Sequence, residues 1–140
     1  MSKTDAFEND LLELIFNAVA IANIAEDNTN SPAATLAVSL HTAPPGETGD
    51  MSTNEATYTS YARQSVARTS SGWVVTGNSV SPNADIDFPT ATGGLETITH
   101  VGIGSGTGNN LMYYGAISPT FAVSEGVTPR VTTDSTITED

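Results

Sequence analysis

The N-terminal part of the chain carries its apolar residues at helical spacing. Between residues 7 and 24 they recur every three or four positions, which predicts an amphipathic helix. Asp5, with Glu8 three positions later, resembles a capping box at its start. A second apolar stripe lies beside the first and consists of Leu12, Phe16 and Val19. So wide an apolar face must be covered on more than one side, either by a partner subunit or by deep burial within the same fold.

Beyond residue 34 the pattern changes to short segments with a period of two. Leu36, Val38 and Leu40 alternate with smaller or polar residues, which predicts a half-buried strand with His41 on its outward side. Further strands are expected at 58–68, 73–76, 79–81, 86–88, 96–103, 111–117 and 135–138. Strands and helices do not alternate in this pattern, so a parallel α/β sheet is excluded.

These elements predict a mainly β fold, an antiparallel jelly-roll or β-sandwich with one N-terminal α-helix. A length of 140 residues fits one domain with an appendage. We therefore expect residues 1–34 to form the helix and a linker, and residues 35–140 to form the jelly-roll domain. Twenty-one threonines and fourteen serines support this interpretation, because threonine favours a pleated, half-wet surface.

The charge balance narrows the classes of partner. Sixteen acidic residues face four basic ones, giving a net charge of −12. Nucleic acid and anionic membranes are not expected partners, because both require clustered cations. Cysteine is absent, which excludes disulfides and thiolate metal sites. The apolar stretch 11–24 is interrupted by Glu13 and two asparagines, so it is read as neither a signal peptide nor a membrane span.

Few residues are candidates for catalysis. His41 and His100 are the only histidines, too few for a zinc site without further ligands, and both are read as structural. Asp85 and Asp87 share one face of a strand and could bind calcium or act as acid and base. Because Ile86 between them points inward, we expect both carboxylates to face water. The sequence predicts no catalytic residue, no metal, no cofactor and no enzymatic activity.

The glycine-rich stretch 102–108 superficially resembles a phosphate-binding loop. Such a loop must open a helix, whereas the residues that follow are typical of a strand and neither lysine nor arginine is near. We interpret the stretch as a hairpin loop.

Arg63 and Arg68 stand out because cations are rare in this chain, and they fall on opposite faces of one predicted strand. Each either pairs with a carboxylate of its own chain or anchors an acidic patch on a partner. The candidate residues of a dimer or capsid interface are Leu12, Phe16, Val19, Arg63 and Arg68.

Eight segments in a fixed order carry a resemblance that extends over nearly the whole chain. They are residues 7–24, 36–49 (LAVSLHTAPPGETG), 53–68, 72–78 (GWVVTGN), 86–89, 97–104 (TITHVGIG), 111–117 and 137–140. Together they resemble a family of small virion proteins of tailed bacteriophages, the jelly-roll capsid cement or decoration proteins.

The resemblance implies a homodimer on the outside of an icosahedral capsid, made in the host cytoplasm and bridging copies of the major capsid protein. Similar proteins are also described as tail-fibre proteins, so a module that recognises a host-surface glycan is the alternative. Such a module needs an exposed aromatic platform; the available aromatic residues are Tyr58, Tyr61, Trp73, Tyr113 and Tyr114. A hydrolase acting through Asp85 or Asp87 is a distant third hypothesis.

Overall fold

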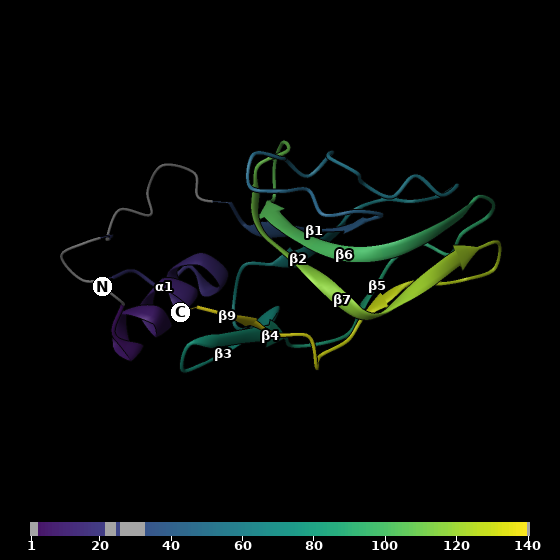
Figure 1. Ribbon diagram of the computed structural model, residues 1–140. Helices are drawn as coiled ribbons and strands as arrows, with labels where there is room; N and C mark the ends of the chain where they lie inside the picture. Colours follow the sequence, from purple (N-terminus) through teal and green to yellow (C-terminus); the bar gives the residue numbers. More distant parts are fainter. Residues whose placement is uncertain (1–2, 22–24, 26–32, 140) are drawn as a thin grey trace. The chain divides into compact units, whose positions relative to one another are not determined.

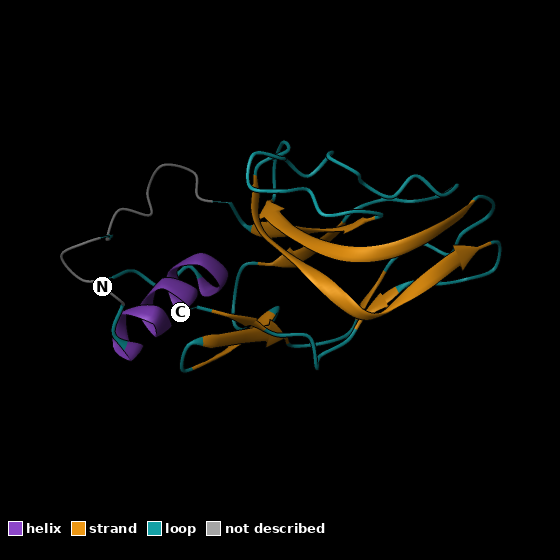
Figure 2. Cartoon of the chain, viewed as in Figure 1, coloured by secondary structure: helices purple, strands orange, loops and turns teal. Residues whose placement is uncertain are grey.

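A computed structural model describes residues 3–21, 25 and 33–139. Within them lie one helix and nine strands, which Figure 2 shows in purple and orange. The helix is α1 (Asp5–Asn17), and the strands are β1 (Thr35–His41), β2 (Gln64–Ala67), β3 (Trp73–Thr76), β4 (Ser79–Pro82), β5 (Ile86–Asp87), β6 (Leu95–Ser105), β7 (Leu111–Ser124), β8 (Arg130–Val131) and β9 (Ile137–Thr138). The prediction of a mainly β, antiparallel fold with one N-terminal helix is confirmed.

The N-cap of the helix lies one residue earlier than predicted, and the helix ends well before residue 24. Thr4, not Asp5, is the N-cap, and its hydroxyl accepts the Phe7 N–H at 3.4 Å. Ala18 adopts a left-handed conformation with φ 56°, which stops the helical hydrogen-bond ladder. The Val19 N–H then bonds back to the Glu13 carbonyl at 3.1 Å. Residues 22–24 of the predicted helix lie outside the described residues.

The chain folds into two compact units, each built from separate stretches. Unit 1 comprises Met1–Ala34, Ala67–Ile86 and Val131–Asp140, and unit 2 comprises Thr35–Val66 and Asp87–Arg130. The N-terminal segment thus forms a unit with later parts of the chain, because α1 packs on β3 and β4. Figure 1 labels these elements.

Unit 1 is built around an aromatic pair. Phe16 on α1 and Trp73 on β3 meet edge to face with ring centroids 4.9 Å apart, a favoured arrangement for aromatic rings. Both side chains are buried, together with Leu12 and Val80. β3 and β4 form an antiparallel hairpin that β9 extends at one edge. Full burial of each large side chain contributes about 1.5–3 kcal/mol, so this small sheet depends on the helix.

Unit 2 contains the main sheet, in the order β2-β1-β6-β7. β1 lies antiparallel to β6, which lies antiparallel to β7 in the long hairpin of Figure 1. The predicted strands 96–103 and 111–117 are therefore both longer than expected. The predicted hairpin at the glycine-rich stretch is confirmed, since the turn after Ser105 joins the two strands.

The prediction that β1 is half-buried, with His41 facing outward, is wrong. Every residue of β1 after Thr35 is buried, and His41 has no exposed surface. The segment that follows β1 folds back along its edge, where the Ala56 N–H bonds to the Leu40 carbonyl at 2.8 Å and the Thr42 N–H to the Asn54 carbonyl at 2.9 Å. It also covers His41, whose Nδ1 lies 2.9 Å from the Thr53 carbonyl. These non-local hydrogen bonds bury residues that alternation alone assigns to solvent.

Candidate functional site

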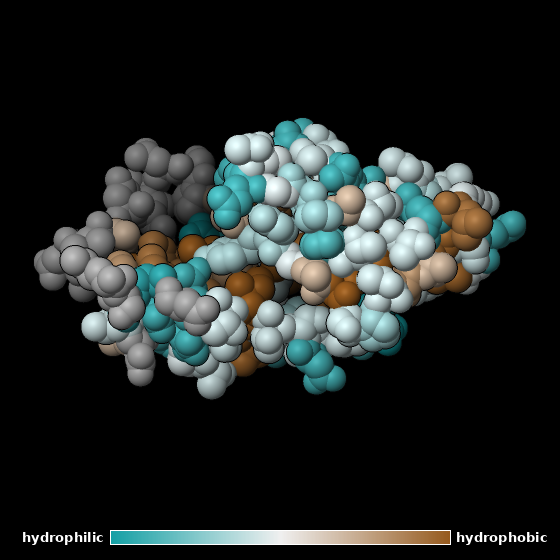
Figure 3. Space-filling model, in the orientation of Figure 1, coloured by the Kyte–Doolittle hydropathy of each residue, from teal (hydrophilic) through white to brown (hydrophobic). Residues whose placement is uncertain are grey.

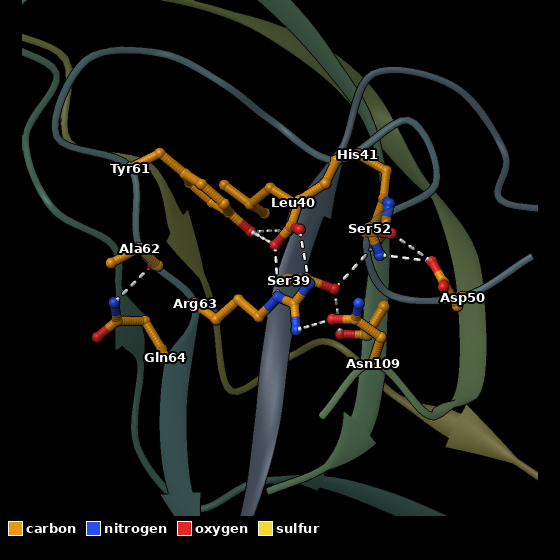
Figure 4. A network of polar contacts seen from close by, with 12 residues as sticks. Ser39, Leu40, His41, Asp50, Ser52, Tyr61, Ala62, Arg63, Gln64 and Asn109 are labelled. Carbon is orange, nitrogen blue, oxygen red and sulfur yellow. Dashed lines mark hydrogen bonds and ion pairs between the residues drawn. The ribbon is translucent and has the colours of Figure 1, made fainter. Parts of the chain in front are cut away.

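The guanidinium of Arg63 is held within unit 2 by hydrogen bonds to four acceptor atoms. Its Nε and Nη2 donate to the two carboxylate oxygens of Glu55 at 2.6 and 2.7 Å. Its Nη1 donates to the Gly108 carbonyl at 3.1 Å and to Asn109 Oδ1 at 3.0 Å, and Figure 4 shows the side chain extending toward Asn109. Arg63 thus ties the turn after β6 to the segment that covers β1.

Tyr61 joins the same network. Its hydroxyl donates to Glu55 Oε1 at 2.9 Å and accepts the Leu40 N–H at 3.1 Å. Burial raises the pKa of Tyr61 far above its ordinary value, and the hydrogen bond to Glu55 raises the pKa of Arg63. Tyr61 therefore remains a neutral donor and Arg63 a cation.

Ser39 and His41 form a hydrogen-bonded pair on β1. His41 Nδ1 lies 2.9 Å from the Thr53 carbonyl, and Nε2 lies 2.8 Å from Ser39 Oγ. Because a carbonyl can only accept, Nδ1 carries the proton and Nε2 accepts from Ser39. Burial lowers the pKa of His41, which favours this neutral form. Neither side chain has exposed surface, so a substrate would not reach the pair.

Two glycines of β6 leave space for the Ser39–His41 pair and for Met51. A Cβ at Gly102 would lie 2.7 Å from His41 Nε2 and 2.8 Å from Ser39 Oγ. A Cβ at Gly104 would lie 2.0 Å from Met51 Sδ. Gly102 leaves room for side chains of β1, and Gly104 leaves room for Met51 of the covering segment. Both are packing reasons rather than phosphate-binding ones.

The other titratable candidates, His100, Asp85 and Asp87, have hydrogen-bond partners of their own. His100 Nδ1 lies 2.8 Å from Thr99 Oγ1. Asp87 receives Arg130 Nε at 2.5 Å and Nη2 at 3.0 Å, and this pairing lowers the pKa of Asp87. Asp85 Oδ1 accepts the Thr133 N–H at 3.0 Å. Among residues 3–21, 25 and 33–139, His, Asp and Glu nowhere gather in threes as a metal site requires.

Arg68 has a role that local sequence reasoning missed. Its Nε donates to the Ile15 carbonyl at 2.6 Å, and its Nη2 donates to the Leu14 carbonyl at 2.5 Å. These carbonyls belong to the last turn of α1, which contains no basic residue of its own. Arg68 therefore satisfies carbonyls that the helix leaves open and complements the negative end of its dipole. No nearby sequence signal links positions 53 residues apart.

The helix residues assigned to an interface differ in exposure. Leu12 and Phe16 have no exposed surface, whereas Val19, just beyond the helix, is 51% exposed. Of these three, Val19 alone offers surface to a partner in the structure as described. The assignment of these residues, and of Arg63 and Arg68, to an interface stays a prediction.

β7 is a largely exposed strand of unit 2. Fourteen residues long, the strand pairs with β6 on one side, and of its residues Val123 alone is buried. Leu111–Ser124 includes no charged residue. Of the five aromatic residues considered as a platform, Trp73 and Tyr58 are buried, Tyr61 and Tyr113 are half-buried, and Tyr114 is exposed.

The sequence matches, over residues 2–138, the family described as Podophage GP4 fiber I protein gp80. The chain belongs to this gp80 family. No curated protein matches it. Membership makes the chain a bacteriophage structural protein with a place in the virion. It supports the phage virion part of the resemblance seen in the sequence, whereas the family description names a fibre and not a cement protein.

For this gp80-family protein, then, the buried polar groups beside β1 hold the fold, and the open surface lies at β7. Within the described ranges, no helix is long and apolar enough to cross a membrane.

Proposed function

We propose that the chain is a non-enzymatic virion subunit that binds the outside of the icosahedral capsid as a homodimer and bridges copies of the major capsid protein. The observation that carries the proposal is β7, a long strand without charged residues in a chain of net charge −12. Among the described strands it has a neighbour along one edge alone, so its other edge is open. An open edge extends a neighbour's sheet through backbone hydrogen bonds. Because β7 has no charged side chain, no charge loses its hydration when a partner strand approaches.

Stabilisation follows from mass action. A protein that binds the assembled shell and not its separate subunits adds its binding free energy to the stability of the shell. Many copies multiply a modest contact. The protein would be made in the host cytoplasm and stay dissolved there until it binds the capsid, because its high negative charge limits non-specific association.

The cations support the proposal that neither nucleic acid nor a membrane is a partner. All four have acceptors within the chain: Lys3 lies 3.3 Å from Glu139, and Arg63, Arg68 and Arg130 are bound as described above. Phosphate binding requires cations that are clustered and available. The inaccessible Ser39 and His41 support the absence of catalysis in the same way.

A second candidate function is a fibre module that recognises a host-surface glycan. The family description, which names a fibre, favours it. So does the exposure of Tyr114, 40% of whose surface is accessible, because an exposed ring can serve as a platform for a sugar. The two candidates differ in location on the virion.

Cryo-electron microscopy of the intact virion distinguishes them. We expect density for the chain on the capsid exterior at two-fold positions. Density on the tail alone would replace the capsid proposal with the fibre candidate. A virion that lacks the gene product gives a second readout, since filled heads should then lose DNA at lower temperature than wild-type heads. Unchanged thermal stability of the heads would count against the bridging role.

A further inference from the structure

A small cavity lies beside β7 in unit 2. It has a volume of about 240 Å³ and is lined by Gly46, Glu47, Gly49, Leu111, Met112 and Tyr114. The segment that covers β1 and β6 supplies one wall, and the start of β7 supplies the other. In Figure 3, hydrophobic residues appear brown among a mostly pale and teal surface.

The loop wall is firmly held. Pro45 is buried, the Gly49 N–H bonds to the Gly46 carbonyl at 3.1 Å, and Asn54 Nδ2 donates to the Pro44 carbonyl at 3.1 Å. A Cβ at Gly49 would lie 2.2 Å from the Pro45 carbonyl oxygen, so glycine is required for this turn. A wall fixed in this way is organised before any ligand arrives, which lowers the entropic cost of binding.

Two polar groups at the cavity are unused. Neither the Glu47 carboxylate nor the Tyr114 hydroxyl has a hydrogen bond or ion pair among the residues the structure describes. Glu55 and Glu96 differ, because both oxygens of each accept hydrogen bonds within the chain. Glu47 and Tyr114 therefore remain available to a partner.

We propose that this cavity takes a lysine or arginine side chain from another protein of the virion. The aliphatic stem packs on Leu111 and Met112, as long basic side chains do on apolar surface. The cationic head pairs with the Glu47 carboxylate and lies against the Tyr114 ring. The net charge of −12 draws a basic surface toward the chain before contact.

The size of the cavity favours one side chain over a glycan. Pockets for small organic ligands span roughly 300–1,000 Å³, and this cavity, at about 240 Å³, is smaller. The inference rests on the proposed function for its partner, a virion protein. The chemistry of the cavity is tested without the virion.

The test is an NMR titration of the full chain with N-acetyl-lysine methylamide, N-acetyl-arginine methylamide and, separately, N-acetylglucosamine. We expect the basic probes to shift the amide signals of Gly46, Glu47 and Met112. Glu47→Gln should weaken this binding by about fivefold, and Tyr114→Leu by about twofold to threefold. The matched control is Glu125→Gln, which removes an equal charge from an exposed residue of unit 2 and should leave the affinity unchanged.

Equal weakening by Glu47→Gln and Glu125→Gln would overturn the inference, because it would show attraction by net charge alone. A response to the sugar without a response to the basic probes would overturn it in favour of a glycan site. Glu47→Gln and its control Glu125→Gln are then introduced into the phage. If the wild-type chain is missing from purified virions, the proposed function fails. If the chain is present and both variants are retained equally, the inference alone fails.

Discussion

β1 and β7 belong to the same four-stranded sheet and have opposite surroundings. β1 has neighbours on both edges and is buried from Leu36 onward, whereas β7 has a neighbour on one edge and is mostly exposed. Beside β1, charged groups are paired within the chain, as Arg63 is with Glu55. Beside β7, Glu47 and Tyr114 have no such partner within the part of the chain that the structure describes. The comparison indicates that the β1 side maintains the fold, and it supports the proposal that the β7 side is the surface for assembly.

The largest expected difference comes from truncating one apolar side chain on each strand. Leu40→Ala on β1 should lower the free energy of unfolding by about 2–5 kcal/mol, because it leaves a cavity in the core. Met112→Ala on β7 should lower it by less than about 1 kcal/mol, since Met112 is already 36% exposed. Urea denaturation of both variants measures the effect. Equal losses would show that the two strands do not differ as described.

The paired charges give the next largest effect. Arg63→Ala leaves the mostly buried Glu55 carboxylate without its cation and frees the turn at Asn109, so we expect a loss of about 2–3 kcal/mol. Arg130→Ala is the control, because it removes the same charge from a pair that is about half exposed. Its effect on urea denaturation should be far smaller. A comparable loss in both variants would argue against a structural role for Arg63.

A smaller effect is expected from acid, through His41. Its pKa is lowered in the folded chain by burial, so the unfolded chain binds more protons between that pKa and 6.5. The free energy of unfolding should therefore fall as pH drops below 6.5 and level off below the pKa of the folded state. His41→Asn should flatten this part of the profile. A profile unchanged by the substitution would mean that His41 does not cause the pH dependence.

Local sequence patterns predict where helices and strands lie better than they predict which other segments pack against them. Alternation places a strand at residues 36–41, close to the observed Thr35–His41. It does not predict that the segment around Asn54 covers that strand, because the hydrogen bonds responsible join positions twelve or more residues apart. The partner of Arg63 lies in an irregular segment, and the carbonyls bound by Arg68 lie in a helix 53 residues earlier. Such pairings depend on the tertiary fold.

The local sequence pattern also does not predict that β7 is exposed. The run from Leu111 to Ile117 is apolar at most positions, which is typical of a buried strand. The structure shows an edge strand in which Tyr114 and Ala116 are exposed. Whether an apolar strand is central or at an edge is decided by how many neighbours it has in the sheet, and sequence periodicity carries no information on that number.

The central claim, that β7 is the assembly surface, is tested most directly by measuring how much of a charged variant is retained on purified virions. Ala116→Glu places a carboxylate on β7, and Ala62→Glu places one at an exposed position of unit 2 ahead of β2, at the other edge of the sheet. Both variants should unfold like the wild-type chain.

We expect Ala116→Glu to be retained at about a tenth of the wild-type level or less, because a charge buried against a partner costs more than 1.4 kcal/mol. Ala62→Glu should be retained normally. Wild-type retention of Ala116→Glu in a folded chain would contradict the account.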